Sequence, residues 1–196
     1  MQTVAPSFSN AVVLVDVEFL NHAIRGAKQS FETMIGRALP TVDLGTLALL
    51  IAAEAQVEKS VKHIQFVFVY DKTCNRLADC TPCNLQTELN GTAFQHEGVE
   101  YEFLSISPEE MVSREELFLD TLSILADSKE VKDLVILPHV GKYGDHVDEC
   151  LKKVSGKHIV QLGLLQPHVP VEGVVYETLV FVLKDSLGVF DDEIPR

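Results

Sequence analysis

The side chains in this sequence that are best suited to chemistry are carboxylates at the ends of apolar segments. Asp16 and Glu18 follow the apolar run AVVLV in the segment VLVDVEFL, and Asp71 follows HIQFVFVY. Asp120 lies among apolar residues in ELFLDTLSIL, and Asp145 follows the apolar segment LVIL a few residues later. Carboxylate oxygens are the ligands that Mg²⁺ and Mn²⁺ prefer. If these carboxylates converge, they can hold a divalent cation that activates water for hydrolysis.

The two leading acids also have purely structural interpretations. Asp is a preferred N-cap residue, so Asp16 could cap the helix that follows it. Asp120 could lie on the exposed stripe of an amphipathic helix. A buried and ionised Asp120 would instead need a cationic partner or a metal ion. Both interpretations of each acid stay open at the level of the sequence.

A second set of potential ligands lies in one irregular stretch, residues 71–96. Cys80 and Cys83 have the C-x₂-C spacing of zinc sites, and Cys74 and His96 are the other two donors in the stretch. These residues predict one of three states: a Zn²⁺ site, a reactive or disulfide-forming pair, or unmetallated thiols. Free thiols are the default, because the chain has only one C-x₂-C pair and four cysteines do not make a secreted disulfide framework.

Alternating apolar segments predict the framework that positions these side chains. The predicted strands are rich in β-branched and aromatic residues, and the predicted helices in Ala, Leu and Glu. The third helix has the clearest start, with Ser107 as N-cap, Pro108 in the first turn and Glu110 three residues after the cap. We expect strands at 11–15, 63–70, 99–106, 134–137 and 158–165, and helices at 19–37, from 43 onward, 107–126, 145–154 and 174–187.

This alternation predicts a three-layer α/β/α sandwich with a mainly parallel five-stranded sheet and a Rossmann-like topology. We expect one domain at 1–190, with a long insertion loop at 71–96 and an acidic tail at 191–196. In such sheets, ligands bind beyond the carboxyl ends of the strands, where Asp16 and Asp71 are predicted to lie.

Composition restricts the class of partner. The chain has 196 residues and a formal net charge of −13, which repels nucleic-acid backbones unless a metal or a local basic patch intervenes. It has no apolar run of about 20 residues and no signal-peptide pattern at its start, so we expect a cytoplasmic protein without a membrane partner. It also lacks the P-loop spacing and a G-x-G-x-x-G after the first strand, so no nucleotide cofactor is predicted.

The order of these motifs resembles the NYN branch of the PIN-like nucleases over nearly the whole chain. VLVDVEFL is similar to that family's opening (hydrophobic)-D-x-E-N motif, and the strand that ends in Tyr70-Asp71 to its second segment. REELFLDTLSILAD resembles the helix with a further aspartate, and DLVILPHVGKYGDHVDECLKKVSGKHIVQLGLL resembles the following strand, helix and strand. The resemblance implies a PIN-like fold and Mg²⁺- or Mn²⁺-dependent RNA cleavage. Its implied ligands are Asp16 and Asp120, with Glu18, Asp71 or Asp145 assisting.

The chain departs from the family pattern at three places. Phe19 replaces the usual Asn, Arg114 and Glu115 stand where an Asp is expected before Asp120, and 138–141 (PHVG) replaces a double-aspartate segment. Three hypotheses therefore remain: a divergent metal-dependent ribonuclease, a catalytically inactive PIN-like domain that binds protein or RNA, or an unrelated α/β domain whose acids are caps. The run GVVYETLVFVL could form a homodimer face or a core helix.

Overall fold

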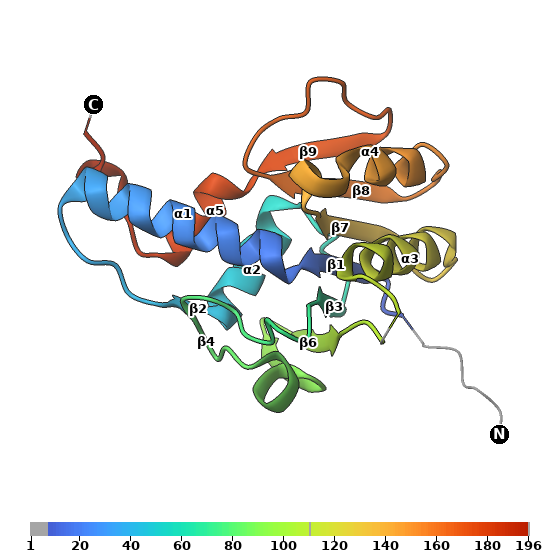
Figure 1. Ribbon diagram of the computed structural model, residues 1–196, viewed down its shortest axis with the longest axis horizontal. Coiled ribbons are helices and arrows are strands. Elements are labelled where there is room, and N and C mark those ends of the chain that lie inside the picture. Colours follow the sequence, from blue (N-terminus) through green and yellow to red (C-terminus); the bar gives the residue numbers. More distant parts are fainter. Residues whose placement is uncertain (1–7, 110, 196) are drawn as a thin grey trace.

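The computed structural model describes residues 8–109 and 111–195, and its centre is one seven-stranded mixed sheet (Figure 1). The strand order is β5-β6-β3-β1-β7-β8-β9, and every neighbouring pair is parallel except β5 with β6. The strands of the sheet are β1 (Ala11–Asp16), β3 (His63–Val69), β5 (Thr92–His96), β6 (Val99–Ile106), β7 (Asp133–Leu137), β8 (His158–Gly163) and β9 (Val174–Thr178). Separately, β2 (Val42–Asp43) pairs with β4 (Cys80–Thr81).

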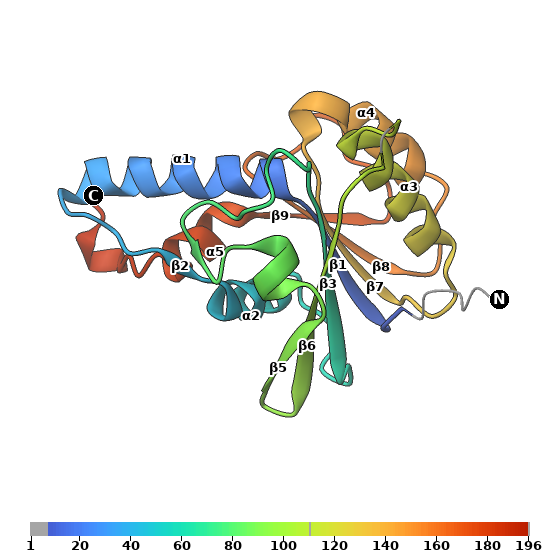
Figure 2. The ribbon, with the colours of Figure 1, turned by 60° about the horizontal axis from the view of Figure 1, so that its bottom comes forward.

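Helices cover both faces of the sheet (Figure 2). One face is covered by α1 (Val17–Ile35), α2 (Leu44–Glu54) and α5 (Leu179–Ser186), and the other by α3 (Arg114–Asp127) and α4 (Val140–Leu151). The remaining elements are two short helices, η1 (Leu85–Leu89) and η2 (Asp191–Glu193). If only the parallel strands are numbered along the chain, the order is 3-2-1-4-5-6, that of doubly wound α/β sheets. The strand order therefore reverses between β1 and β7, because the strands after β1 are added on one side of it as far as β6 and on the other side from β7 onward.

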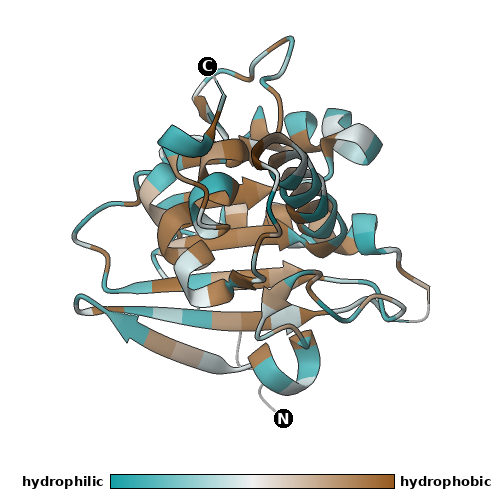
Figure 3. Ribbon diagram, turned by 90° about the vertical axis from the view of Figure 1, so that its left-hand side faces the viewer, coloured by the Kyte–Doolittle hydropathy of each residue, from teal (hydrophilic) through white to brown (hydrophobic). Residues whose placement is uncertain are grey.

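Alternation along β1 explains both halves of the core. Ala11, Val13 and Val15 pack toward α1, α2 and α5, while Val12 and Leu14 pack toward α3 and α4, and all five are fully buried. Apolar residues accordingly concentrate in the strands and on the helix faces that contact them (Figure 3). Because successive side chains in a strand point to opposite faces, Asp16 continues the Val12–Leu14 face. Its carboxylate therefore points toward α3 and α4.

The predicted parallel framework is confirmed, and the sheet is wider than predicted. All five expected strands are present, but the expected helix at 174–187 is wrong in its first part. Residues Val174–Thr178 form the edge strand β9, as their β-branched and aromatic side chains favour, and α5 begins only at Leu179. The Thr178 side chain accepts the Val180 N–H and caps that helix. The other added strand, β5, lies inside the expected loop 71–96 and forms a hairpin with β6, which follows that loop.

The start of α3 is a second correction, because the helix begins at Arg114 and not near Ser107. Ser113 is the N-cap: its Oγ accepts the Glu116 N–H at 3.1 Å, and Glu116 Oε2 accepts the Ser113 N–H at 2.8 Å. This reciprocal capping box satisfies two backbone donors that would otherwise be free. Glu110, part of the predicted start, lies outside the described residues. The later start places Arg114 in the first turn, at the carboxyl edge of the sheet.

The remaining elements differ in smaller ways from expectation. α4 starts at Val140, five residues before its predicted start, and has a kink at Tyr143, where φ is −141°. In the expected acidic tail, Glu193 pairs with Arg37 at 2.7 Å. Residues 1–7, on which most of the signal-peptide expectation rests, lie outside the described residues. Within 8–109 and 111–195, no helix combines the length and apolarity needed to cross a bilayer.

Candidate functional site

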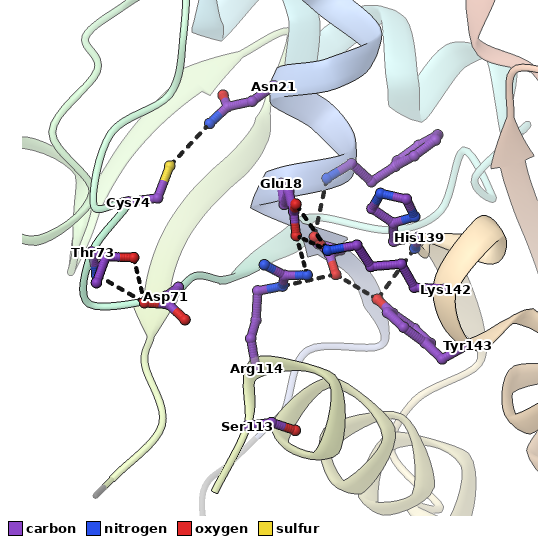
Figure 4. A network of polar contacts seen from close by, with 12 residues as sticks. Glu18, Asn21, Asp71, Thr73, Cys74, Ser113, Arg114, His139, Lys142 and Tyr143 are labelled. Carbon is purple, nitrogen blue, oxygen red and sulfur yellow. Dashed lines mark hydrogen bonds and ion pairs between the residues drawn. The ribbon is translucent and has the colours of Figure 1, made fainter.

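A cluster of charged side chains lies at the point where the strand order reverses, between β1 and β7. In doubly wound sheets this switch point, beyond the carboxyl ends of the strands, is where ligands bind. β1 contributes Asp16 at its last position, and α1 contributes Glu18 in its first turn. The segment after β7 contributes Lys142 and Tyr143, and Arg114 enters from the start of α3 (Figure 4).

The carboxylate of Asp16 is fully buried, and both of its oxygens accept hydrogen bonds. Oδ1 accepts the backbone N–H of Phe19 at 3.0 Å, so Asp16 is the N-cap of α1. Oδ2 accepts from Arg114 Nε at 3.1 Å and from the Tyr143 hydroxyl at 2.5 Å. Asp16 thus fulfils the capping role that was one of its two interpretations, and it also lies in the candidate site.

Arg114 connects the two acids of the site. Its Nε donates to Asp16, its Nη2 forms an ion pair with Glu18 Oε2, and its side chain is only 10% exposed. Burial acts to lower the pKa of Arg114, but the charges of Asp16 and Glu18 outweigh burial and raise it. The guanidinium therefore stays charged and serves as the counter-ion of a fully buried carboxylate.

Lys142 neutralises the second acid. Its Nζ lies 2.9 Å from each carboxylate oxygen of Glu18, on the half-exposed side of the site. The hydrogen bond from Lys142 lowers the pKa of Glu18, and the charge of Arg114 adds to this against the opposing effect of burial. Asp16 and Glu18 are therefore matched by Arg114 and Lys142, so the formal charge of the cluster is zero.

Tyr143 links this network to the β7–α4 connection. Its hydroxyl donates to Asp16 and accepts the backbone N–H of His139 at 3.2 Å. Burial raises the pKa of Tyr143, and the adjacent Asp16 charge raises it further, so the hydroxyl remains a donor. The His139 ring packs edge-on against Phe19 with centroids 6.2 Å apart. The His139 Nδ1 atom is buried and has no hydrogen-bond partner within the described part of the chain.

The residues at this site do not fit a divalent metal ion. Mg²⁺ needs near-octahedral oxygen ligation, whereas the oxygens of Asp16 and Glu18 already accept bonds from Arg114, Tyr143, Lys142 and a backbone amide. Among residues 8–109 and 111–195, no group of three or more His, Cys, Asp or Glu side chains is placed to hold a metal.

The other predicted acidic ligands are not brought to Asp16. Asp120 lies on the solvent side of α3, and Asp145 is exposed on α4. Asp71 follows β3 and accepts both the N–H and the hydroxyl of Thr73 at 2.8 Å. Those two bonds lower the pKa of Asp71, and Arg114 contributes a smaller effect of the same sign. Asp71 therefore lies near the network, but its carboxylate accepts its hydrogen bonds from Thr73 in its own turn.

The predicted zinc ligands lie at different edges of the sheet. Cys74 follows the carboxyl end of β3 and contacts Asn21 Nδ2 at 3.6 Å, whereas His96 ends β5 opposite Val99, the first residue of β6. The eight residues of β6 separate these edges by roughly 23 Å, since they span seven steps of about 3.3 Å. Cys80 is buried, which raises the pKa of its thiol to about 12, and all four cysteines are free.

The sequence alone does not identify Arg114, Lys142 and Tyr143 as members of the site. One signal was available for Arg114, because Arg114 and Glu115 stand where the resemblance implies an Asp. For Lys142 and Tyr143, the signal was their position after the fourth predicted strand, at the edge where ligands bind. The bond from each to a specific acid depends on the kinked first turn of α4, which no sequence pattern indicates.

Comparisons with known proteins leave the function to be argued from this geometry. Residues 5–194 match a family whose description is "Family of unknown function (DUF6621)". No curated protein and no solved structure matches the chain. The family match covers nearly the same span as the sheet and its helices, so it applies to the fold as a whole.

Proposed function

We propose that this chain, which belongs to the DUF6621 family of unknown function, is a non-catalytic PIN-like domain that acts by binding a protein partner. One observation carries the proposal: the Arg114 guanidinium lies between Asp16 and Glu18, where a nuclease would need a divalent cation. The PIN-like assignment is supported by the doubly wound sheet and by an acid at the carboxyl end of its first strand.

The energetics of the buried pair support a permanent arrangement. Removal of one partner from a buried ion pair typically costs about 3–5 kcal/mol, because the other charge is left uncompensated. A metal that displaced Arg114 would leave a largely buried guanidinium without Asp16 and Glu18. The pairing of Arg114 with Asp16 therefore joins α3 to β1 and gives the acidic site a structural role.

Charge favours protein over RNA as the partner. The chain carries a net charge of −13, and both cations of the site are paired with acids. RNA binding depends on cations that are free to neutralise phosphates. By contrast, the connections that leave the carboxyl ends of β6 and β8 present apolar side chains, with Met111 96% and Leu165 89% exposed. Both side chains are on connections that leave the same edge of the sheet as the neutral network, and exposed apolar groups there suit a protein interface.

A cleavage assay separates this proposal from the metal-dependent ribonuclease. Wild type and Asp16→Asn are incubated with labelled RNA and Mg²⁺ or Mn²⁺, and Mn²⁺ binding is measured by calorimetry. We expect no binding heat and the same residual cleavage in both proteins, as contamination would give. Cleavage that Asp16→Asn abolishes would support the ribonuclease and overturn the non-catalytic proposal.

The protein-binding part is tested with surface variants. Tagged wild type, the double variant Met111→Ser/Leu165→Ser and the control Met34→Ser are used to recover partners from the source cell. Met34 is exposed on α1, away from the carboxyl edge of the sheet. We expect a protein that wild type and Met34→Ser retain and the double variant loses. Recovery of RNA in its place, or equal recovery by all three, would contradict the proposal.

A further inference from the structure

A cavity of about 1010 Å³ opens at the amino ends of β3 and β6, the edge of the sheet opposite Asp16. One wall is the carboxyl-terminal half of α2 with the α2–β3 connection, and the other is the start of β3 and the β5–β6 hairpin. Its volume lies at the upper end of the range of about 300–1,000 Å³ for small-molecule sites. It shares no lining residue with the charged network.

The cavity exists because α2 is too short to cover this part of the sheet. α2 ends at Glu54, and Gln56, with a φ of 51°, turns the chain away. The amino ends of β3 and β6 continue past this point, and the β5–β6 hairpin extends beyond α2 (Figure 2). Ile64 and Tyr101 face the opening from these strands, and Leu50 and Val57 face it from the α2 side.

The rim of the cavity is polar and contains two lysines without acidic partners. Lys59 and Lys62 are exposed at the mouth, and neither forms an ion pair with another residue in the described ranges. The neighbouring carboxylate of Glu58 accepts the Ser60 hydroxyl at 2.6 Å. Glu97 lines the hairpin side of the cavity, so the two lysines make the α2–β3 side of the rim its cationic side.

We propose that this cavity binds a monomeric amphipathic carboxylate of the fatty-acid class. The hydrocarbon chain lies on the apolar floor between α2 and the hairpin, and the carboxylate pairs with Lys59 and Lys62 at the rim. Burial of the chain supplies most of the affinity, because each CH₂ group removed from water adds to it. The two lysines select an acid over the matching alcohol. The proposal is independent of the function proposed for the carboxyl edge.

Fluorescence titration with cis-parinaric acid tests the site in the full chain. We expect saturable one-to-one binding that dodecanoate reverses by competition. Ala53→Trp, at an exposed lining position, fills the cavity and should weaken binding by tenfold or more. Ala38→Trp makes the same change at an exposed position before Leu39, outside the cavity lining, and should bind as wild type does. The lack of saturable binding by wild type, or unchanged affinity in Ala53→Trp, would overturn the proposal.

The role of the lysines is tested separately. Lys59→Gln/Lys62→Gln should weaken competition by dodecanoate about tenfold, which corresponds to about 1.4 kcal/mol, and leave competition by dodecanol unchanged. Lys72→Gln/Lys129→Gln, at two exposed lysines outside the cavity, controls for the change in net charge. An equal loss for the acid and the alcohol, or the same loss in the control pair, would contradict the proposed pairing.

Discussion

The Nε atom of Arg114 lies 3.1 Å from Oδ2 of Asp16, although the two residues are 98 positions apart in the chain. One is in the first turn of α3 and the other ends β1, so the pair connects a helical layer to the centre of the sheet. Because Asp16 is fully buried, its charge depends on this partner. The pair therefore contributes to folding as well as to the electrostatics of the carboxyl edge.

Arg114→Gln should destabilise the fold by about 3 kcal/mol, because it leaves the buried Asp16 carboxylate without its counter-ion. Urea unfolding at pH 7 measures the difference. Arg25→Gln is the matched control, since Arg25 is exposed on α1, and it should change stability by less than about 0.5 kcal/mol. The double variant Asp16→Asn/Arg114→Gln should lose less than the sum of the two single variants, and additive losses would contradict direct coupling.

Arg114→Asp should convert the network into a site for a divalent metal. The change removes the cation and adds a carboxylate beside Asp16 and Glu18, with Asp71 close enough to feel the charge at position 114. We expect Mn²⁺ to bind the variant in calorimetry and to raise its melting temperature, as a ligand of the folded state must. Arg114→Gln removes the cation without adding an acid and should show neither effect. Equal Mn²⁺ binding by wild type would contradict the present account of the site.

Tyr143→Phe should cost about 2 kcal/mol of stability, because it removes a hydrogen bond to the charged Asp16 and leaves the His139 N–H without its acceptor. Tyr176→Phe is the comparison, since within the described ranges the Tyr176 hydroxyl accepts only the Val171 backbone N–H at 3.0 Å, and it should cost about 1 kcal/mol. Chemical denaturation of both variants gives the two values. A smaller loss for Tyr143→Phe than for Tyr176→Phe would show that the contact with Asp16 contributes little.

The parts of the fold that the sequence predicts are those set by local patterns. The apolar runs of β1, β3 and β7 are buried on both faces, so their composition alone indicates central parallel strands. β9 escapes prediction because its residues, VVYET, continue directly into the apolar helix α5 without a turn signal. β5 escapes because its side chains are mostly exposed and its pairing with β6 comes from the hairpin.

The candidate site also has one part that local sequence patterns predict and one part that they do not. The position of Asp16 follows from β1 alone, since an acid directly after a buried strand must lie at the carboxyl edge of the sheet. The partner of Asp16 depends on which residue starts α3, and two Ser-x-x-Glu patterns, at Ser107 and at Ser113, compete for that role. A shift of six residues in the N-cap, from Ser107 to Ser113, decides whether Arg114 lies in a helix interior or at the edge of the sheet, so local pattern alone cannot determine it.

The competition between these two helix starts is itself testable. Ser113→Ala should cost about 1 kcal/mol, since it removes the side-chain oxygen that accepts the Glu116 N–H. Ser107→Ala changes the alternative cap, which precedes the helix by several residues, and should cost no more than about 0.5 kcal/mol. Thermal unfolding of the two variants under one condition gives the comparison. A larger loss for Ser107→Ala would place the start of the helix upstream of Arg114.

The stability contributed by the carboxyl-terminal turn should depend on pH. Glu193 pairs with Arg37, and hydrogen bonds from Arg37 and from the Phe190 N–H lower the pKa of Glu193 from 4.5 to about 2. A carboxylate with a depressed folded-state pKa stabilises the fold fully above its unfolded value, and this contribution is lost as the pH falls through the folded value.

Wild type should therefore melt at a higher temperature than Glu193→Gln at pH 7, and the difference should shrink below pH 4.5 and vanish below pH 2, where the wild-type side chain becomes neutral too. Glu130→Gln, at an exposed position after α3 with no ion pair in the described ranges, should show no such trend. A difference between wild type and Glu193→Gln that stays constant from pH 7 to pH 2 would mean that the turn is held by contacts other than the charge of Glu193.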